Sequence, residues 1–259
     1  MGLAPLLGRI YGSVCNNRPM SVPLSDEPKS WNTWGEQRSS SETLHLDNAA
    51  AGRSSEAVLQ ATSGHALLEA QIGAYVAEEM AASALDDGRA ALAGLLGVPT
   101  DGVAYLESAS AALKALLGVW PLRAGDSVAV VPSEWGPNLE AFAGRGLEIT
   151  ELAALGDGRI DLAYLAELLA TSPPTLVHLT QVASHRGLVQ PVAEAAHMCR
   201  THGVPLWVDA AQALGHVDTA SGADALYSTG RKWLAGPRGV GMVGIAEAWW
   251  ASSLSRCPL

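Results

Sequence analysis

The feature of this sequence that most constrains its fold is a regular alternation of short apolar runs and helical stretches, which begins near Leu44. Short apolar runs between turn residues are typical of buried strands, and strands that alternate with helices form parallel sheets covered on both faces. We therefore predict an α/β fold, a three-layer sandwich around a mostly parallel sheet. The 259 residues, 48% of them hydrophobic, suffice for one large core.

Turn residues set the expected element boundaries, as where Gly97 and Pro99 end a helix. We expect helices at 54–70, 84–96, 110–119, 162–169 and 192–201. We expect strands at 103–106, 127–131, 147–151, 175–179, 205–208, 225–227 and 240–245.

Composition excludes several classes of protein. The net charge is -10 and no run of lysine or arginine is present, so nucleic acid is not an expected partner. Every apolar stretch is interrupted before the roughly 18 residues that a membrane span requires, so no membrane contact is expected. Cys15, Cys199 and Cys257 lack disulfide or metal-ligand spacing, which predicts no metal site and indicates the reducing cytoplasm.

The chain divides by composition into three parts. Residues 1–40 carry several prolines and the Ser39–Ser41 run, so we expect a disordered tail, or a wrongly assigned start. Residues 41–250 are expected to form one large domain. Residues 251–259 show neither a helix nor a strand period, and we expect an irregular end there.

Two segments combine residue types that carry chemistry. Pro205–Asp209 is an apolar strand that ends in a carboxylate, and open α/β sheets bind ligands at the carboxyl ends of their strands. Further along, Ala223–Lys232 leads through small residues to a lysine, and Gly236–Gly241 follows with three glycines. Together these segments resemble the signature of the class V aminotransferases, a family of pyridoxal-phosphate enzymes.

The resemblance implies pyridoxal 5'-phosphate as the cofactor, and a role for each residue that matches the signature. Lys232 would carry the cofactor as a Schiff base and later move protons. Asp209 would pair with the pyridine nitrogen and keep it positively charged. Gln212 would donate to the phenolic oxygen, and Thr229 and Arg231 would contact the phosphate.

Three further cofactor contacts are expected nearer the start of the domain. Ser108, Ala109 and Ser110 open a helix and form a candidate phosphate cradle, although the family usually has glycine and threonines there. An ordinary serine helix cap is the alternative. Trp135 stands where cysteine desulfurases commonly have the ring-stacking histidine, and could instead be a packing residue. Gln181 matches the family's asparagine beside the cofactor oxygen.

Three other stretches, Leu46–Arg53, Tyr75–Glu78 and Ser184–Pro191, resemble the carbon-sulfur lyases of ergothioneine biosynthesis. This resemblance implies a β-lyase that cleaves hercynylcysteine sulfoxide to give pyruvate and ammonia, and a homodimer. The expected substrate residues are Asn48, Ala49, His185 and Arg186. The last two follow Gln181 on a loop, where they could bind a carboxylate or an imidazole-bearing substrate, or could instead be exposed polar loop residues.

Two other functions remain open. One is a cysteine desulfurase or class V aminotransferase, but a desulfurase needs a mobile cysteine after the lysine segment, and Cys257 is a poor candidate. The other is a truncated, catalytically deficient chain that still binds the cofactor. Members of the family continue into a C-terminal small domain, which we expect this chain to lack.

Overall fold

The computed structural model describes residues 36–249. By its internal contacts the chain divides into residues 1–36 and 37–259, and the fold described below is that of the second unit. Apart from residues 36–40, the predicted tail lies outside the described residues, as does the predicted irregular end. None of the helices within 36–249 is long and apolar enough to cross a membrane.

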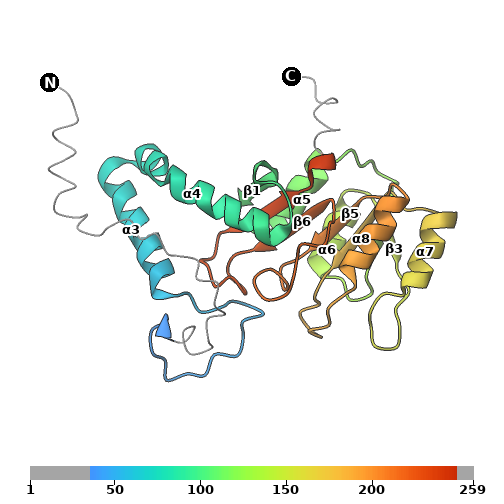
Figure 1. Cartoon of the computed structure of the whole chain (residues 1–259), viewed down its shortest axis with the longest axis horizontal. Coiled ribbons are helices and arrows are strands. Elements are labelled where there is room, and N and C mark those ends of the chain that lie inside the picture. Colours follow the sequence, from blue (N-terminus) through green and yellow to red (C-terminus); the bar gives the residue numbers. More distant parts are fainter. Residues whose placement is uncertain (1–35, 250–259) are drawn as a thin grey trace, which may run out of the picture. The chain divides into compact units, whose positions relative to one another are not determined.

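A seven-stranded sheet forms the centre of this unit (Figure 1). Four pairs of adjacent strands run parallel: β3 with β2, β2 with β4, β4 with β5, and β5 with β6. The strand β7 runs antiparallel to its neighbours β1 and β6. The predicted mostly parallel α/β sheet is therefore confirmed. Across the sheet the strands are β1 (Val103–Leu106), β7 (Gly241–Ile245), β6 (Ala225–Thr229), β5 (Leu206–Asp209), β4 (Leu176–Thr180), β2 (Ser127–Val130) and β3 (Glu148–Glu151).

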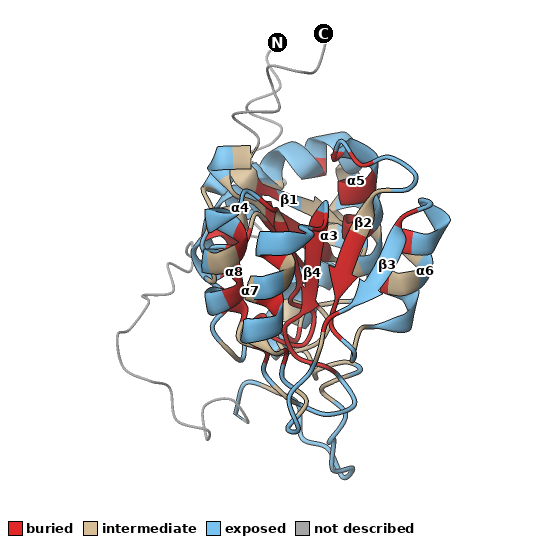
Figure 2. Cartoon of the chain, turned by 90° about the vertical axis from the view of Figure 1, so that its right-hand side faces the viewer, coloured by how far each residue is buried: buried red, intermediate tan, exposed pale blue. Residues whose placement is uncertain are grey.

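Helices pack on both faces of the sheet, and Figure 2 shows buried strands such as β2 and β4 between them, whereas β3 is exposed. One face is covered by α5 (Ala109–Val119) and α6 (Gly136–Gly144). The other is covered by the end of α4 (Ala74–Leu96), by α7 (Leu162–Thr171) and by α8 (Val192–Thr201). The helix α3 (Glu56–Ile72) precedes α4, and a short 3-10 turn, η1 (Thr100–Gly102), precedes β1.

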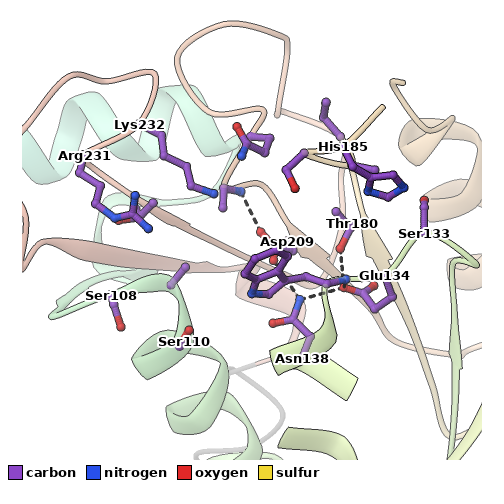
Figure 3. A pocket seen from close by; sticks show the side chains of 18 residues that line it. Ser108, Ser110, Ser133, Glu134, Asn138, Thr180, His185, Asp209, Arg231 and Lys232 are labelled. Atoms are coloured by element: carbon purple, nitrogen blue, oxygen red, sulfur yellow. Dashed lines mark hydrogen bonds between the residues drawn. The ribbon is translucent and has the colours of Figure 1, made fainter. Parts of the chain in front are cut away.

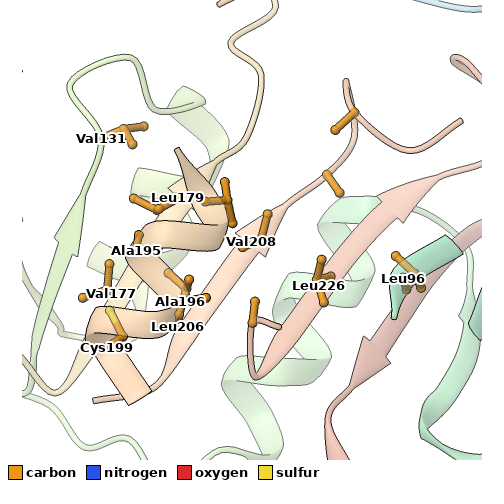
Figure 4. Close-up of a cluster of buried hydrophobic side chains, with 14 of the residues drawn as sticks. Leu96, Val131, Val177, Leu179, Ala195, Ala196, Cys199, Leu206, Val208 and Leu226 are labelled. Atoms are coloured by element: carbon orange, nitrogen blue, oxygen red, sulfur yellow. The ribbon is translucent and has the colours of Figure 1, made fainter. Parts of the chain in front are cut away.

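The two cores follow from the period of two along a strand, which sends successive side chains to opposite faces. On β5, Trp207 packs toward α5, whereas Leu206 and Val208 pack toward α8. Figure 4 shows the α8 side, where Cys199 lies among these aliphatic side chains. Burial, together with the nearby charge of Asp224, raises the pKa of the Cys199 thiol to about 12.

Two helices differ from the sequence prediction. The helix expected at 84–96 begins at Ala74, ten residues earlier, because Gly73 at φ +87° separates it from α3. Its first turns show no amphipathic pattern, since apolar residues such as Tyr75, 89% exposed, point outward. Helix α6 was not predicted, although Pro137 in its first turn is a known start signal. The other boundaries agree within two residues.

The order of the strands creates a crevice at one edge of the sheet. After β2 the chain passes through α6 to β3, and after β4 it passes through α8 to β5, on the opposite face. Where successive connections leave on opposite faces, the carboxyl ends of the adjacent strands are left open to a ligand. The fold therefore places a binding site beyond the ends of β2, β4 and β5.

Candidate active site

A cavity of about 220 Å³ lies at this edge (Figure 3). Its lining comes from the turns that follow β1, β2, β4, β5 and β6, together with the first residues of α5 and α6. Segments far apart in the sequence therefore meet around one space. Lys232 and Asp209 both line it.

Asp209 is the last residue of β5 and is 6% exposed. Its neighbours in the sheet register are Thr180 on β4 and Tyr227 on β6. Its carboxylate accepts from the Asn138 amide nitrogen at 2.9 Å and from the Ala211 backbone N–H at 2.8 Å. Burial raises the pKa of Asp209, while these two hydrogen bonds act in the opposite direction.

Lys232 lies in the turn that follows β6, and Figure 3 shows its side chain extending toward Asp209. Burial lowers the pKa of Lys232; the charge of Arg231 acts in the same direction and that of Asp209 opposes it. A lysine with a lowered pKa has more of the neutral amine, which is the form that attacks an aldehyde.

Two glycines allow other segments to approach this turn. A Cβ on Gly52 would lie 2.3 Å from the carbonyl oxygen of Lys232, and the Gly52 N–H donates to the Arg231 carbonyl at 2.7 Å. A Cβ on Gly241 would lie 2.3 Å from the carbonyl carbon of Ser108. Glycine is therefore required at both positions, and the second contact holds the start of α5 against β7.

The start of α5 has the features of an anion site. Ser108 is its N-cap, and the Ser108 hydroxyl accepts from the Ala111 N–H at 3.1 Å. The N–H groups of the first helical residues, Ala109 and Ser110, have no partner within a helix. All three predicted cradle residues line the cavity, so the unpaired N–H groups and the helix dipole favour a phosphate there.

The structure brings four other predicted cofactor residues to the cavity. Trp135, directly before α6, is 52% exposed and free to present its ring. The amide of Gln212 donates to the Ala49 carbonyl and accepts from the Trp233 indole, each at 2.8 Å, which leaves one amide hydrogen for a ligand. The other two are Thr229 and Arg231, whose side chains also donate to the carbonyls of Val240 and Ala50.

Gln181 is not brought to the cavity. It follows Thr180 directly, so the period of two along the strand sends its side chain to the opposite face of the sheet. There the Gln181 amide donates to the Asp218 carbonyl at 2.7 Å. Thr180, one residue earlier, lines the cavity in its place.

Of the four predicted substrate residues, only His185 lines the cavity. Arg186 points away, because its guanidinium lies against Gly158. Asn48 and Ala49 are not part of the lining, although the Ala49 carbonyl accepts from the lining residue Gln212.

Sequence reasoning missed a buried polar cluster beneath the cavity. Glu134 accepts from the Trp135 N–H and the Asn138 amide, each at 2.8 Å, and from the Thr180 hydroxyl. Its other oxygen lies 2.9 Å from Nδ1 of His178, which contacts the Tyr227 hydroxyl through Nε2 at 2.9 Å. Pro137 is a helix-start signal in the sequence. It could have indicated that a helix begins here and that Asn138, four residues after Glu134, lies close to it.

The charges in this cluster are set by these contacts. Burial by itself would raise the pKa of Glu134, but His178 and the hydrogen bonds from His178, Thr180 and Asn138 outweigh it and lower that pKa. Burial, then the charges of Asp209 and Glu134, raises the pKa of Tyr227 well above its usual value. Glu134 is therefore an anion and Tyr227 a neutral hydroxyl.

The cavity fits pyridoxal phosphate. It offers an amine of lowered pKa, a buried carboxylate, an exposed indole and a helix N-terminus around one space. Buried Oγ of Ser133, which has no partner within 36–249, also lines it and can bond to a ligand. Lys232 would hold the aldehyde, Asp209 would hold the ring nitrogen, and Ser110 would hold the phosphate.

Comparison with known proteins agrees with this fold. The family profile described as Aminotransferase class-V matches residues 44–252. The chain therefore belongs to the class-V aminotransferase family.

Among individual proteins, the chain is similar to a probable hercynylcysteine sulfoxide lyase of Mycobacterium tuberculosis. The two are 48% identical over 229 residues, which are 88% of this chain and 56% of that protein. A probable cysteine desulfurase of Methanothermobacter thermautotrophicus is 28% identical over 183 residues, 66% of this chain and 44% of that protein. The chain thus spans about half the length of the curated relatives it matches.

Solved structures show the same fold. The apo cysteine desulfurase of Thermococcus onnurineus matches with a TM-score of 0.70 at 23% identity, over 82% of this chain and 55% of that one. A lysine-to-alanine mutant of C-DES, with glycine covalently linked to its pyridoxal-phosphate cofactor, also matches. Its TM-score is 0.70 at 22% identity, over 81% of this chain and 58% of that one. The family and these relatives identify pyridoxal 5'-phosphate as the cofactor.

The lysine assignment can be tested directly, because the sequence contains only three lysines, Lys29, Lys114 and Lys232. We expect pyridoxal phosphate to give a visible absorption band, and borohydride to fix the cofactor on Lys232. Lys232→Ala should abolish both. Lys114→Ala on the exposed side of α5 is the matched control and should change neither, as peptide mass spectrometry will show. Fixation on Lys114 would contradict the assignment.

The capture of the cofactor should depend on pH in a defined way. The neutral amine is the reactive form, so capture should increase with pH and reach half its maximum below the ordinary lysine value of 10.5. Asp209→Asn removes a negative charge that favours the ammonium form, and should move this midpoint to still lower pH. Stopped-flow absorbance measures the midpoint, and an upward movement in the variant would contradict the charge assignment.

Proposed function

We propose that the chain is the cofactor-binding part of a carbon-sulfur β-lyase that acts on hercynylcysteine sulfoxide. The observation that carries this proposal is the convergence of Lys232 and Asp209 on one cavity, in a chain 48% identical to a probable lyase of that name. The relatives are about twice as long as the matched region, so the activity of the whole protein is part of the proposal.

When bound, pyridoxal phosphate supplies an aldehyde that captures amines and a ring that withdraws electrons from the substrate α-carbon. The residues of this chain have four tasks around it. The amine of Lys232 takes the proton from the α-carbon, for which its lowered pKa suits it. Asp209 would hold the positive charge of the ring nitrogen, Trp135 would cover the ring face, and the start of α5 would bind the phosphate; all of them line the cavity.

The proposed outcome is loss of the sulfur group from the β-carbon. Removal of the α-proton by Lys232 would leave the C–H electron pair on the α-carbon. That pair would form a double bond to the β-carbon, and the sulfur substituent would leave with the electrons of the broken carbon-sulfur bond. Hydrolysis of the remaining three-carbon unit would give pyruvate and ammonia. His185 is the one predicted substrate residue on the cavity wall, and we propose that it contacts the departing sulfur-bearing portion.

A desulfurase has less support from the site. That reaction requires a thiol near the cofactor to receive the sulfur. Within residues 36–249 the free cysteine is Cys199, which is buried on the α8 side of the sheet with a raised pKa. Cys15 and Cys257 lie outside the described residues. We therefore rank the lyase above the desulfurases that are among its relatives.

The lyase proposal predicts pyruvate from hercynylcysteine sulfoxide in the presence of the cofactor. Lys232→Ala should reduce the rate at least about a hundredfold, the scale expected for removal of a general base. A lactate dehydrogenase coupled assay measures the product, and Lys114→Ala serves as the control. Alanine from free cysteine, without pyruvate from the sulfoxide, would instead establish a desulfurase.

We also propose that the chain forms a homodimer through α3 and the first turns of α4. None of the residues in α3 is buried, and Leu67 and Tyr75 are largely exposed. Such apolar exposure is typical of an interface. Light scattering should give the mass of two chains, and Leu67→Glu should reduce it to one. Leu155→Glu, at another exposed leucine, is the control and should leave the mass unchanged.

A further inference from the structure

Asn138 occupies a special position in the polar cluster beneath the cavity. It lies on α6, is 2% exposed and lines the cavity. Its one amide nitrogen donates to Glu134 Oε1 at 2.8 Å and to Asp209 Oδ2 at 2.9 Å (Figure 3). Two buried carboxylates therefore share one neutral donor.

The chemistry of the amide restricts the state of both carboxylates. An amide nitrogen has two hydrogens and cannot accept, so each oxygen that faces it has to be an acceptor. A protonated carboxyl could not present its O–H in this direction. The other oxygen of Asp209 is also an acceptor, because it receives the Ala211 N–H at 2.8 Å. Both oxygens of Asp209 are thus held in the arrangement of an ionised carboxylate.

Without Asn138, Asp209 and Glu134 would face each other with no donor between them. Glu134 is fixed as an anion by His178 and Thr180, so its charge would favour protonation of Asp209. Burial of Asp209 favours protonation as well, since an unpaired buried charge is costly. A protonated Asp209 could not hold a positive charge on a pyridine nitrogen.

We propose that Asn138 is a positioning residue for the cofactor ring, which keeps the Asp209 carboxylate ionised and directed at the pyridine nitrogen. Asn138 acts through Asp209, so its effect depends on the ring nitrogen and not on the phosphate or the aldehyde. A merely structural asparagine would support all parts of the cofactor alike.

The ring nitrogen can be isolated by comparing two ligands. Pyridoxal phosphate and 1-deazapyridoxal phosphate, in which carbon replaces that nitrogen, share the aldehyde and the phosphate. Their dissociation constants for the full chain are measured by quenching of tryptophan fluorescence. We expect Asn138→Ala to weaken pyridoxal phosphate at least about tenfold, the scale of a charge-assisted contact, and the deaza compound less than about twofold.

A double-mutant cycle gives a second, independent readout. In an Asp209→Ala background the further change Asn138→Ala should alter the affinity for pyridoxal phosphate less than about twofold, because the group through which Asn138 acts is gone. Independent effects of the two changes would overturn the proposal, as would equal losses of affinity for the two ligands.

The matched control is Gln190→Ala. Gln190 is also an amide that is 2% exposed, and it too makes two hydrogen bonds, accepting from the Ile160 N–H and donating to the Gly158 carbonyl, but it does not line the cavity. The Gln190→Ala change should leave unchanged the ratio of the dissociation constants of pyridoxal phosphate and 1-deazapyridoxal phosphate.

A second variant is available if Asn138→Ala does not fold, as judged by circular dichroism. Asn138→Ser keeps one donor and should change that ratio less than Asn138→Ala is expected to. An unchanged ratio in the serine variant would overturn the proposal.

The inference rests on pyridoxal phosphate as the cofactor, and the two can fail separately. If the unaltered chain did not bind pyridoxal phosphate, the cofactor and the role of Asn138 would both be wrong. If it bound and the ratio did not change in the variants, the role of Asn138 alone would be wrong.

Discussion

The buried carboxylate of Asp209 is the constraint on which the rest of the site depends. A charge in this position is unfavourable unless donors surround it, and Asn138 and Ala211 supply them. Those donors come from α6 and from the turn after β5, so both segments must be in place before the carboxylate can remain ionised. The polar cluster around Glu134 then ties β4 and β6 to the same point.

The sheet makes this convergence possible. Asp209 is aligned with Thr180 and Tyr227 on the two adjacent strands, so three polar side chains arrive at one level of one face. Two residues earlier on the same face, Trp207 packs under α5 and is aligned with His178, which belongs to the polar cluster. Along β5, Trp207 is therefore part of the hydrophobic core, and Asp209, two residues later on the same face, lines the cavity. The core thus supports the polar site directly.

Much of this arrangement could be predicted from the sequence. Asp209 follows an apolar strand, and Lys232 follows a strand and small residues, so their positions at strand ends were readable from local pattern. Other positions were not. Gln181 was predicted to contact the cofactor oxygen, yet the strand extends one residue further than expected and its alternation sends Gln181 to the far face. The roles of the site residues themselves stay predictions.

By itself the sequence determined the kind of elements, their order, the lysine and the carboxylate, because apolar periodicity and turn residues act over a few neighbouring positions. Only the tertiary structure decided which side chains share the cavity. That depends on strand register and on the packing of a helix, α6, that brings Asn138 to a carboxylate 71 positions away along the chain. Contacts between distant segments are fixed by how whole surfaces pack, and no local pattern contains that information.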